Sequence, residues 1–129
     1  MKSVVICGSR RYKKEIREFA AQLRKAGIEV YEPLLKEFNF QELDIDEEAK
    51  RIAISGVTLE HLQKIRKADV VFIYNKERYI GISTTLEIGA AAILGRPIYA
   101  FEREKEDLVR DILFNGIIKT PQELIQKLK

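Results

Sequence analysis

Residues 3–31, SVVICGSRRYKKEIREFAAQLRKAGIEVY, contain a complete strand–helix–strand unit. The first five residues are apolar and mostly β-branched, as in a buried strand, and a glycine and a serine follow them. Apolar residues then recur at helical spacing, which predicts a helix over 13–26 that ends at Gly27. Residues 28–31 form a second predicted strand. Such a unit holds its two strands parallel with a right-handed crossover.

The rest of the chain continues this alternation. Further strands are predicted over 69–74, 97–101 and 116–119, and helices over 58–67, 84–94, 105–113 and from Thr120 onward. The stretch 34–55 carries a weaker signal, a short helix near Ala49–Ala53 after an irregular charged segment. Alternating strands and helices predict an α/β fold. We expect one domain over 1–129, with an open, doubly wound parallel sheet of about five strands in three α/β/α layers. The expected strand order is the flavodoxin-like, Rossmann-like order 2-1-3-4-5.

The composition fits a single domain with a surface of mixed charge. Of 129 residues, 46% are apolar and 33% are charged, which is enough apolar material for one core. Basic and acidic residues are interspersed and leave a net charge of +3, so we expect no nucleic-acid polymer as a partner. No apolar run approaches the roughly 20 residues that span a bilayer, and the start is too short for a signal peptide. We therefore expect a cytoplasmic protein without membrane contact.

In sheets of this order, ligands bind beyond the carboxyl ends of the strands, where the order reverses. Gly8, Ser9 and Arg10 follow the first strand, where free N–H groups and an arginine favour a phosphate or carboxylate. Simple turn chemistry is the alternative reading of the same residues. The chain lacks the glycine spacing of dinucleotide folds and the Gly-Lys-Ser/Thr ending of nucleotide triphosphatases. We therefore expect no cofactor.

Two interpretations of Glu87 compete. Thr84-x-x-Glu87 has the spacing of a capping box, which needs no function. Alternatively, Glu87 leads a stripe of small apolar residues at helical spacing, Ala90, Ala91 and Leu94, at the edge where ligands bind. The helix N-terminus would then favour its ionised form. The residue pattern leaves both interpretations open.

Other side chains are candidates for the same edge. They are Asn75 after the third strand, Tyr12 and Tyr79 as stacking rings, and the small or hydroxyl residues Gly81 and Ser83. His61, the only histidine, lies on the border of an apolar helix face, where a structural role is the alternative. Cys7, the only cysteine, lies inside a strand and is expected simply to pack. One histidine and scattered carboxylates supply no ligand spacing, so we expect no metal.

Three segments together resemble the nucleoside 2-deoxyribosyltransferase-like superfamily, which includes deoxynucleoside-monophosphate N-glycosidases. They are VVICGSRR (4–11), HLQKIRKADVVFIYN (61–75) and YIGISTTLEIGAAAILGRPIYAF (79–101). The run Thr84-Thr85-Leu86-Glu87 also resembles the Gly-Thr-x-x-Glu loop of nucleoside-monophosphate phosphoribohydrolases. Both resemblances imply chemistry on N-glycosidic bonds.

The resemblance implies that Glu87 is the nucleophile that attacks the anomeric carbon of a nucleoside or nucleoside 5′-monophosphate. Ser9, Arg10, Ser83 and Thr84 would hold the sugar or phosphate, and His61 would orient the ligand or help to protonate the base. Many family members carry an aspartate at the position of His61, and an aspartate or serine at that of Gly81. These departures keep open a nucleotide-binding or sensing domain without catalysis. A transferase strict for base exchange is a third interpretation.

The predicted helix 84–94 is apolar nearly all the way round. The sheet can cover only one of its sides, so the rest needs another partner. We therefore expect a homo-oligomer, with a two-fold dimer as the simplest arrangement.

Overall fold

The computed structural model describes residues 2–33, 44–105 and 107–129. Its five strands form one sheet in which every neighbouring pair is parallel. The strands are β1 (Ser3–Gly8), β2 (Glu29–Tyr31), β3 (Val70–Tyr74), β4 (Ile98–Ala100) and β5 (Gly116–Ile117). Their order is β2-β1-β3-β4-β5, which confirms the predicted topology. The order reverses between β1 and β3, so the crevice expected for a ligand lies above these two strands.

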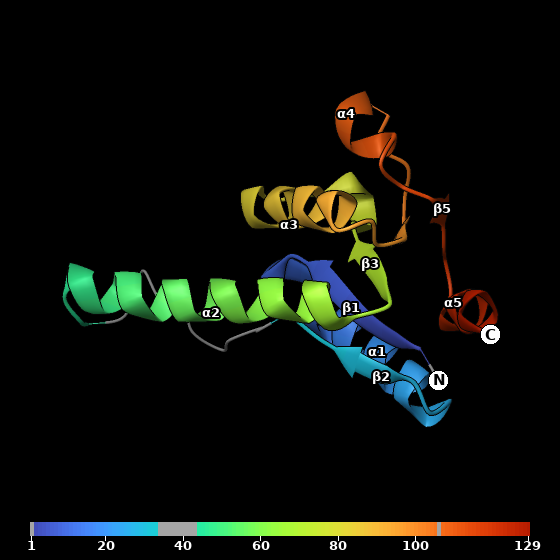
Figure 1. The fold of residues 1–129 in the computed structure, drawn as a ribbon, viewed down its shortest axis with the longest axis horizontal. Coiled ribbons are helices and arrows are strands. Elements are labelled where there is room, and N and C mark those ends of the chain that lie inside the picture. The colour runs from blue at the N-terminus through green and yellow to red at the C-terminus, as the bar shows by residue number, and fades with distance from the viewer. Residues whose placement is uncertain (1, 34–43, 106) are drawn as a thin grey trace.

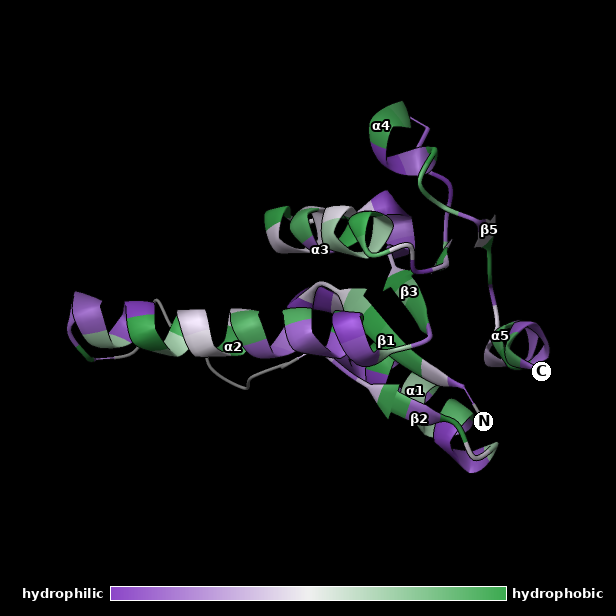
Figure 2. Cartoon of the chain, in the orientation of Figure 1, coloured by the Kyte–Doolittle hydropathy of each residue, from purple (hydrophilic) through white to green (hydrophobic). Residues whose placement is uncertain are grey.

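Helices cover both faces of the sheet (Figure 1). On one face, α1 (Lys13–Lys25) and α5 (Pro121–Leu128) pack on the even-numbered β1 side chains Val4 and Ile6. On the other face, α2 (Glu47–Lys67) and α3 (Ile82–Ile93) share a core with Val5 and Cys7. The alternation of side chains along a strand therefore decides that Cys7 faces α2 and α3. Both faces of β1 are buried, and Figure 2 shows β1 and β3 as largely hydrophobic.

The helix ends follow the chemistry expected from the sequence. Gly27 adopts a φ of 84° just after α1, a left-handed conformation that glycine takes without strain. The hydroxyl of Thr120 accepts the N–H of Glu123 at the start of α5. Within the described residues, none of the helices combines the length and the apolar character that a bilayer crossing requires.

The sequence prediction is wrong about α2, which is one helix of 21 residues rather than two short ones. Asp46 caps it, accepting the N–H of Ala49 at 2.7 Å. Gly56 lies mid-helix with open space around it, where a glycine costs only about 1 kcal/mol relative to alanine. The N-terminal half of α2 extends beyond the sheet (Figure 1). Of the weakly predicted stretch 34–55, residues 34–43 lie outside the described residues.

The predicted helix 105–113 is also wrong in extent, because α4 covers only Leu108–Asp111. The carboxylate of Asp111 accepts the backbone N–H of Glu104 at 2.8 Å and so ties the end of α4 to Glu104. The side chain of Glu104 is buried and contacts Arg110 at 2.7 Å. A buried charge needs such a partner, and Arg110 of α4 supplies it.

Candidate active site

A cavity of about 770 Å³ lies at the carboxyl edge of the sheet, where the order reverses between β1 and β3. This volume is within the range of small-molecule sites. Nine of the residues selected from the sequence line it: Gly8, Ser9, Arg10, His61, Tyr79, Gly81, Ser83, Thr84 and Glu87. Segments far apart in the chain therefore meet at the position that the topology predicts.

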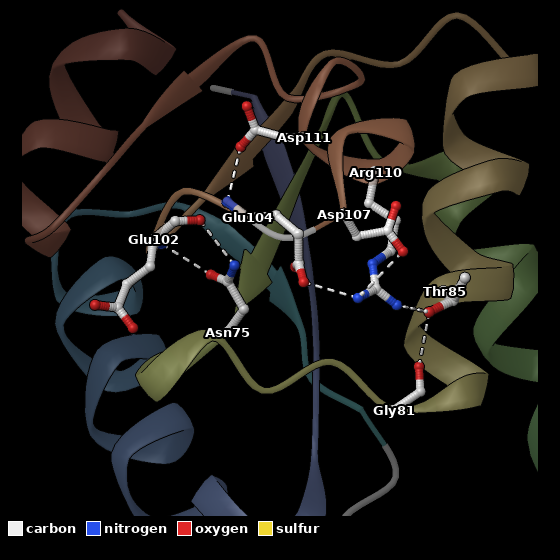
Figure 3. A network of polar contacts seen from close by, with 8 residues as sticks. All are labelled: Asn75, Gly81, Thr85, Glu102, Glu104, Asp107, Arg110 and Asp111. Atoms are coloured by element: carbon white, nitrogen blue, oxygen red, sulfur yellow. Dashed lines mark hydrogen bonds and ion pairs between the residues drawn. The ribbon is translucent and has the colours of Figure 1, made fainter.

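Two of the selected residues lie elsewhere. Tyr12 is buried in the core beside α1, with its ring centroid 6.1 Å from that of Tyr74, so it is not placed to stack on a ligand. Asn75 is fully buried and spans the backbone of Glu102, donating to its carbonyl at 2.8 Å and accepting its N–H at 2.9 Å (Figure 3). Asn75 therefore fixes the turn after β3 to the end of β4.

Glu87 is not part of a capping box. The helix α3 begins at Ile82 with Gly81 as its N-cap, so Thr84 lies inside the first turn and Glu87 in the second. Thr84 itself is buried. The carbonyl of Gly81 accepts hydrogen bonds from the N–H and the hydroxyl of Thr85. The earlier start turns the side chain of Glu87 toward β1 and α2 rather than toward its own helix end.

Glu87 meets Cys7 of β1 and His61 of α2 at the base of the cavity. The Nε2 atom of His61 lies 3.4 Å from a carboxylate oxygen of Glu87 and 3.4 Å from the sulfur of Cys7. The side chain of Glu87 is 17% exposed and that of His61 6%, whereas Cys7 is fully buried. A carboxylate with a small open side is thus directed at the space where a ligand would lie.

Burial controls the protonation of this group. It raises the pKa of Glu87 to about 7, although a hydrogen bond with Cys7 opposes the shift. Burial lowers the pKa of His61 to about 4, so the imidazole is neutral at pH 7 and its contact with Glu87 is not an ion pair. Burial, together with the nearby Glu87 carboxylate, raises the pKa of the Cys7 thiol well above its ordinary value. The expectation that the helix N-terminus favours ionised Glu87 is wrong, because the dipole effect fades beyond the first turn.

The loop after β1 packs tightly against its neighbours and contacts the loop that carries Tyr79. A methyl group at Gly8 would lie 3.0 Å from a side-chain carbon of Ile16 and 3.1 Å from the backbone oxygen of Tyr74, so only glycine fits without displacement. Ser9 caps the short turn that follows by accepting the N–H of Arg11 at 3.1 Å. The guanidinium of Arg11 packs over the ring of Tyr79, 3.8 Å from its centroid. The two loops that flank the crevice are thereby joined.

A polar network fixes the start of α3 (Figure 3). Arg110 of α4 donates to the hydroxyl of Thr85 at 3.0 Å, and that hydroxyl donates to the carbonyl of Gly81 at 3.0 Å. The same guanidinium contacts Glu104 at 2.7 Å and Asp107 at 3.7 Å. The first turn of α3, which lines the cavity, is therefore held from outside by α4.

Another hollow, of about 910 Å³, lies along the outer half of α2. Its lining runs from Glu47 to Leu59, much of it exposed, and includes none of the strand-end residues. The parallel-sheet rule favours the cavity beside Glu87 instead.

Sequence reasoning missed Cys7 as a member of the site. Its position at the end of β1, on the face it shares with Val5, was the available signal. Cys7, His61 and Glu87 also form a group of three metal-ligand types whose donor atoms all lie within 4.8 Å of one another. The prediction that the chain has no group of metal-ligand residues is therefore corrected. The three residues come from three separate elements, so no short sequence motif contains them. The apolar part of the lining is formed by Pro33, Val57, Leu62, Ile80, Ile82 and Leu86.

Comparison with solved structures finds proteins of similar fold. A structure of 2-deoxyribosyltransferase from Bacillus psychrosaccharolyticus superposes with a TM-score of 0.67 at 19% identity, covering 95% of this chain and 89% of that chain. A conserved protein from Enterococcus faecalis superposes with a TM-score of 0.65 at 15% identity, covering 99% and 97%. No curated protein matches the sequence. The family model described as nucleoside 2-deoxyribosyltransferase matches residues 6–126, and the chain therefore belongs to the nucleoside 2-deoxyribosyltransferase family.

Proposed function

We propose that this protein cleaves or transfers the N-glycosidic bond of a deoxynucleoside or its 5′-monophosphate, with Glu87 as the nucleophile. The observation that carries the proposal is a half-buried carboxylate at the base of a cavity of about 770 Å³ in a chain of this family. The cavity is large enough for a nucleoside.

The reaction proceeds in two displacements. A Glu87 carboxylate oxygen bonds to the anomeric carbon as the bond to the base nitrogen breaks, and the base leaves with that electron pair and takes up a proton. Water or a second base then attacks the same carbon and releases the carboxylate. Each step passes through an oxocarbenium-like centre that a nearby carboxylate stabilises. Because burial raises the pKa of Glu87 to about 7, both the reactive carboxylate and the protonated acid are populated near neutral pH.

His61 orients Glu87 in this proposal. Its Nε2 atom lies 3.4 Å from the carboxylate, and the ring is held between α2 and β1. With a pKa of about 4, His61 is a neutral imidazole that can donate one hydrogen bond but is a poor source of protons for the departing base. The proton on the base then comes from solvent or from another group at the cavity.

The direct test is a panel of deoxynucleosides and their 5′-monophosphates, with release of free base as the readout. A hydrolase releases base from at least one member in water alone, whereas a strict transferase needs a free acceptor base. Tight binding of a panel member without base release, with or without acceptor, would favour the non-catalytic domain and reject the proposal.

Arg10 tests the phosphate preference. We expect Arg10→Ala to raise the KM for a monophosphate about tenfold or more and to leave the KM for the matching nucleoside nearly unchanged, because a charge-assisted bond to phosphate contributes about 1.5–3 kcal/mol. Arg17→Ala, which removes the same charge from the exposed side of α1, is the control for net charge. Equal effects of Arg10→Ala on both substrates would contradict a phosphate contact.

The outer face of α3 supports a homodimer as the assembly. Ile93 of α3 is 90% exposed, and Leu108, Val109 and Ile112 of the α4 region are also exposed, whereas the exposed Ile82 and Leu86 line the cavity. We expect Ile93→Lys to convert a dimer into a monomer in light scattering, because a charge in an apolar interface is left unpaired. Leu59→Lys, at an exposed apolar site on α2, is the matched control. A parent protein that is monomeric at working concentration refutes the dimer.

A further inference from the structure

Three potential metal ligands from three elements converge below the cavity. Cys7 comes from β1, His61 from α2 and Glu87 from α3, and their donor atoms lie within 4.8 Å of one another. Cys7 and His61 are 0% and 5% exposed, so neither side chain can turn to bulk solvent for its polar partners. The convergence is therefore fixed by the packing of both helices on the sheet.

Hydrogen bonding alone serves this group poorly. A single ring nitrogen of His61 faces both the thiol and the carboxylate, and it carries either a proton or a lone pair. The ring nitrogen can therefore complete only one of the two contacts at a time, and the thiol forms a further hydrogen bond with Glu87. The nitrogen-to-oxygen separation of 3.4 Å is also longer than the usual 2.7–3.2 Å of such bonds. A bound ion would satisfy all three donors together.

Two of the three ligand separations match a tetrahedral metal centre, and the third, between Cys7 and Glu87, is within 4.8 Å. Bonds of about 2.3 Å from Zn²⁺ to sulfur and about 2.0–2.2 Å to nitrogen and oxygen separate neighbouring ligand atoms by about 3.3–3.6 Å. The sulfur-to-nitrogen and nitrogen-to-oxygen separations here are both 3.4 Å. Thiolate, imidazole and carboxylate are also the ligand types that Zn²⁺ takes in proteins.

We propose that Cys7, His61 and Glu87 bind Zn²⁺, and that the ion switches off glycosyl transfer by occupying the nucleophile. His61 and Glu87 line the cavity and Cys7 lies beneath it, which leaves the fourth position of the ion on the cavity side for water. On binding, the thiol releases its proton to solvent and the sulfur coordinates as a thiolate. The oxygen lone pair of Glu87 that would attack the sugar is then engaged by the metal.

The binding test uses metals alone on the full chain. Because Cys7 is the only cysteine, a thiolate-to-Co²⁺ charge-transfer band on titration with Co²⁺ reports this site and no other. We expect one Co²⁺ per chain, displaced by Zn²⁺. Cys7→Ser should abolish the band and weaken Zn²⁺ binding by more than about 100-fold in calorimetry, since even partners of ligands affect affinity by about 10–100-fold.

Glu48→Gln is the matched control, because Glu48 is an exposed carboxylate on α2 and lies outside the ligand group. We expect it to bind both metals as the parent does. If Cys7→Ser does not fold, His61→Gln provides the same comparison. Absence of the band in folded parent protein, or equal Zn²⁺ affinity in the parent and in a folded ligand variant, overturns the metal site.

The inhibitory role rests on the proposed function, so it has a separate readout. With a substrate that the parent turns over, stoichiometric Zn²⁺ should lower base release at least about tenfold, and a chelator should restore it. Unchanged or faster turnover in the Zn²⁺-loaded protein overturns inhibition. If no substrate is turned over even without metal, the proposed function fails while the binding result stands.

Discussion

Replacing Glu87 with glutamine is expected to lower base release from a nucleoside or its monophosphate by roughly 1,000-fold or more, because loss of a nucleophile removes the covalent route itself. Glutamine keeps the size and polarity of the side chain, so the cavity and the fold should persist. Initial rates with saturating substrate, and a thermal melt of the variant, are the measurements. The rate should fall in kcat, with substrate binding largely retained.

Glu48→Gln is again the appropriate control, because it removes an exposed carboxylate from α2, the helix that supplies His61. We expect its kcat to remain within about twofold of the parent, as exposed substitutions away from a site have small effects. A Glu87→Gln variant with parental kcat would remove Glu87 from the mechanism. A glycosyl adduct found on another residue by mass spectrometry would do so too.

The sheet and its order could be predicted because strand signals in this chain are local. Residues 3–7 and 70–73 are apolar on both faces, which a parallel strand covered by helices requires. Gly27 and Thr120 mark helix ends through their own backbone and side-chain chemistry. The position of the site follows from the strand order alone, since a reversal between β1 and β3 opens a crevice there.

Features set by contacts between distant elements could not be read in this way. The capping box at Thr84 fits the local spacing, yet the helix begins earlier, and Arg110 of α4 supports its first turn through Thr85. Asn75 lies after a strand as a ligand residue would, but its amide is taken by the backbone of Glu102. The position of Cys7 near the end of β1 is a local signal for the edge of the sheet, but its contact with His61 depends on where α2 packs.

The contact between Arg110 and Glu104 is expected to be the most sensitive polar interaction of the fold. The Glu104 side chain is 7% exposed and that of Arg110 22% exposed, and the two are joined at 2.7 Å. Arg110→Met would leave a buried carboxylate without its cation. We expect a loss of about 3 kcal/mol in the free energy of unfolding, measured by urea denaturation, which is near the lower end for breaking a buried pair.

The double variant Arg110→Met, Glu104→Met separates this charge effect from packing. Because no uncompensated charge remains, it should recover at least about half of the lost stability. It does not restore the hydrogen bond from Arg110 to Thr85 that fixes the first turn of α3 beside the cavity. We therefore expect kcat/KM for base release to remain on the order of tenfold below that of the parent in the double variant, since small misplacements of a catalytic group are costly.

Thr85→Val, which removes the same hydrogen bond from the other side, should show a comparable loss of activity with little loss of stability. Full recovery of activity in the stable double variant would limit the network to a structural role.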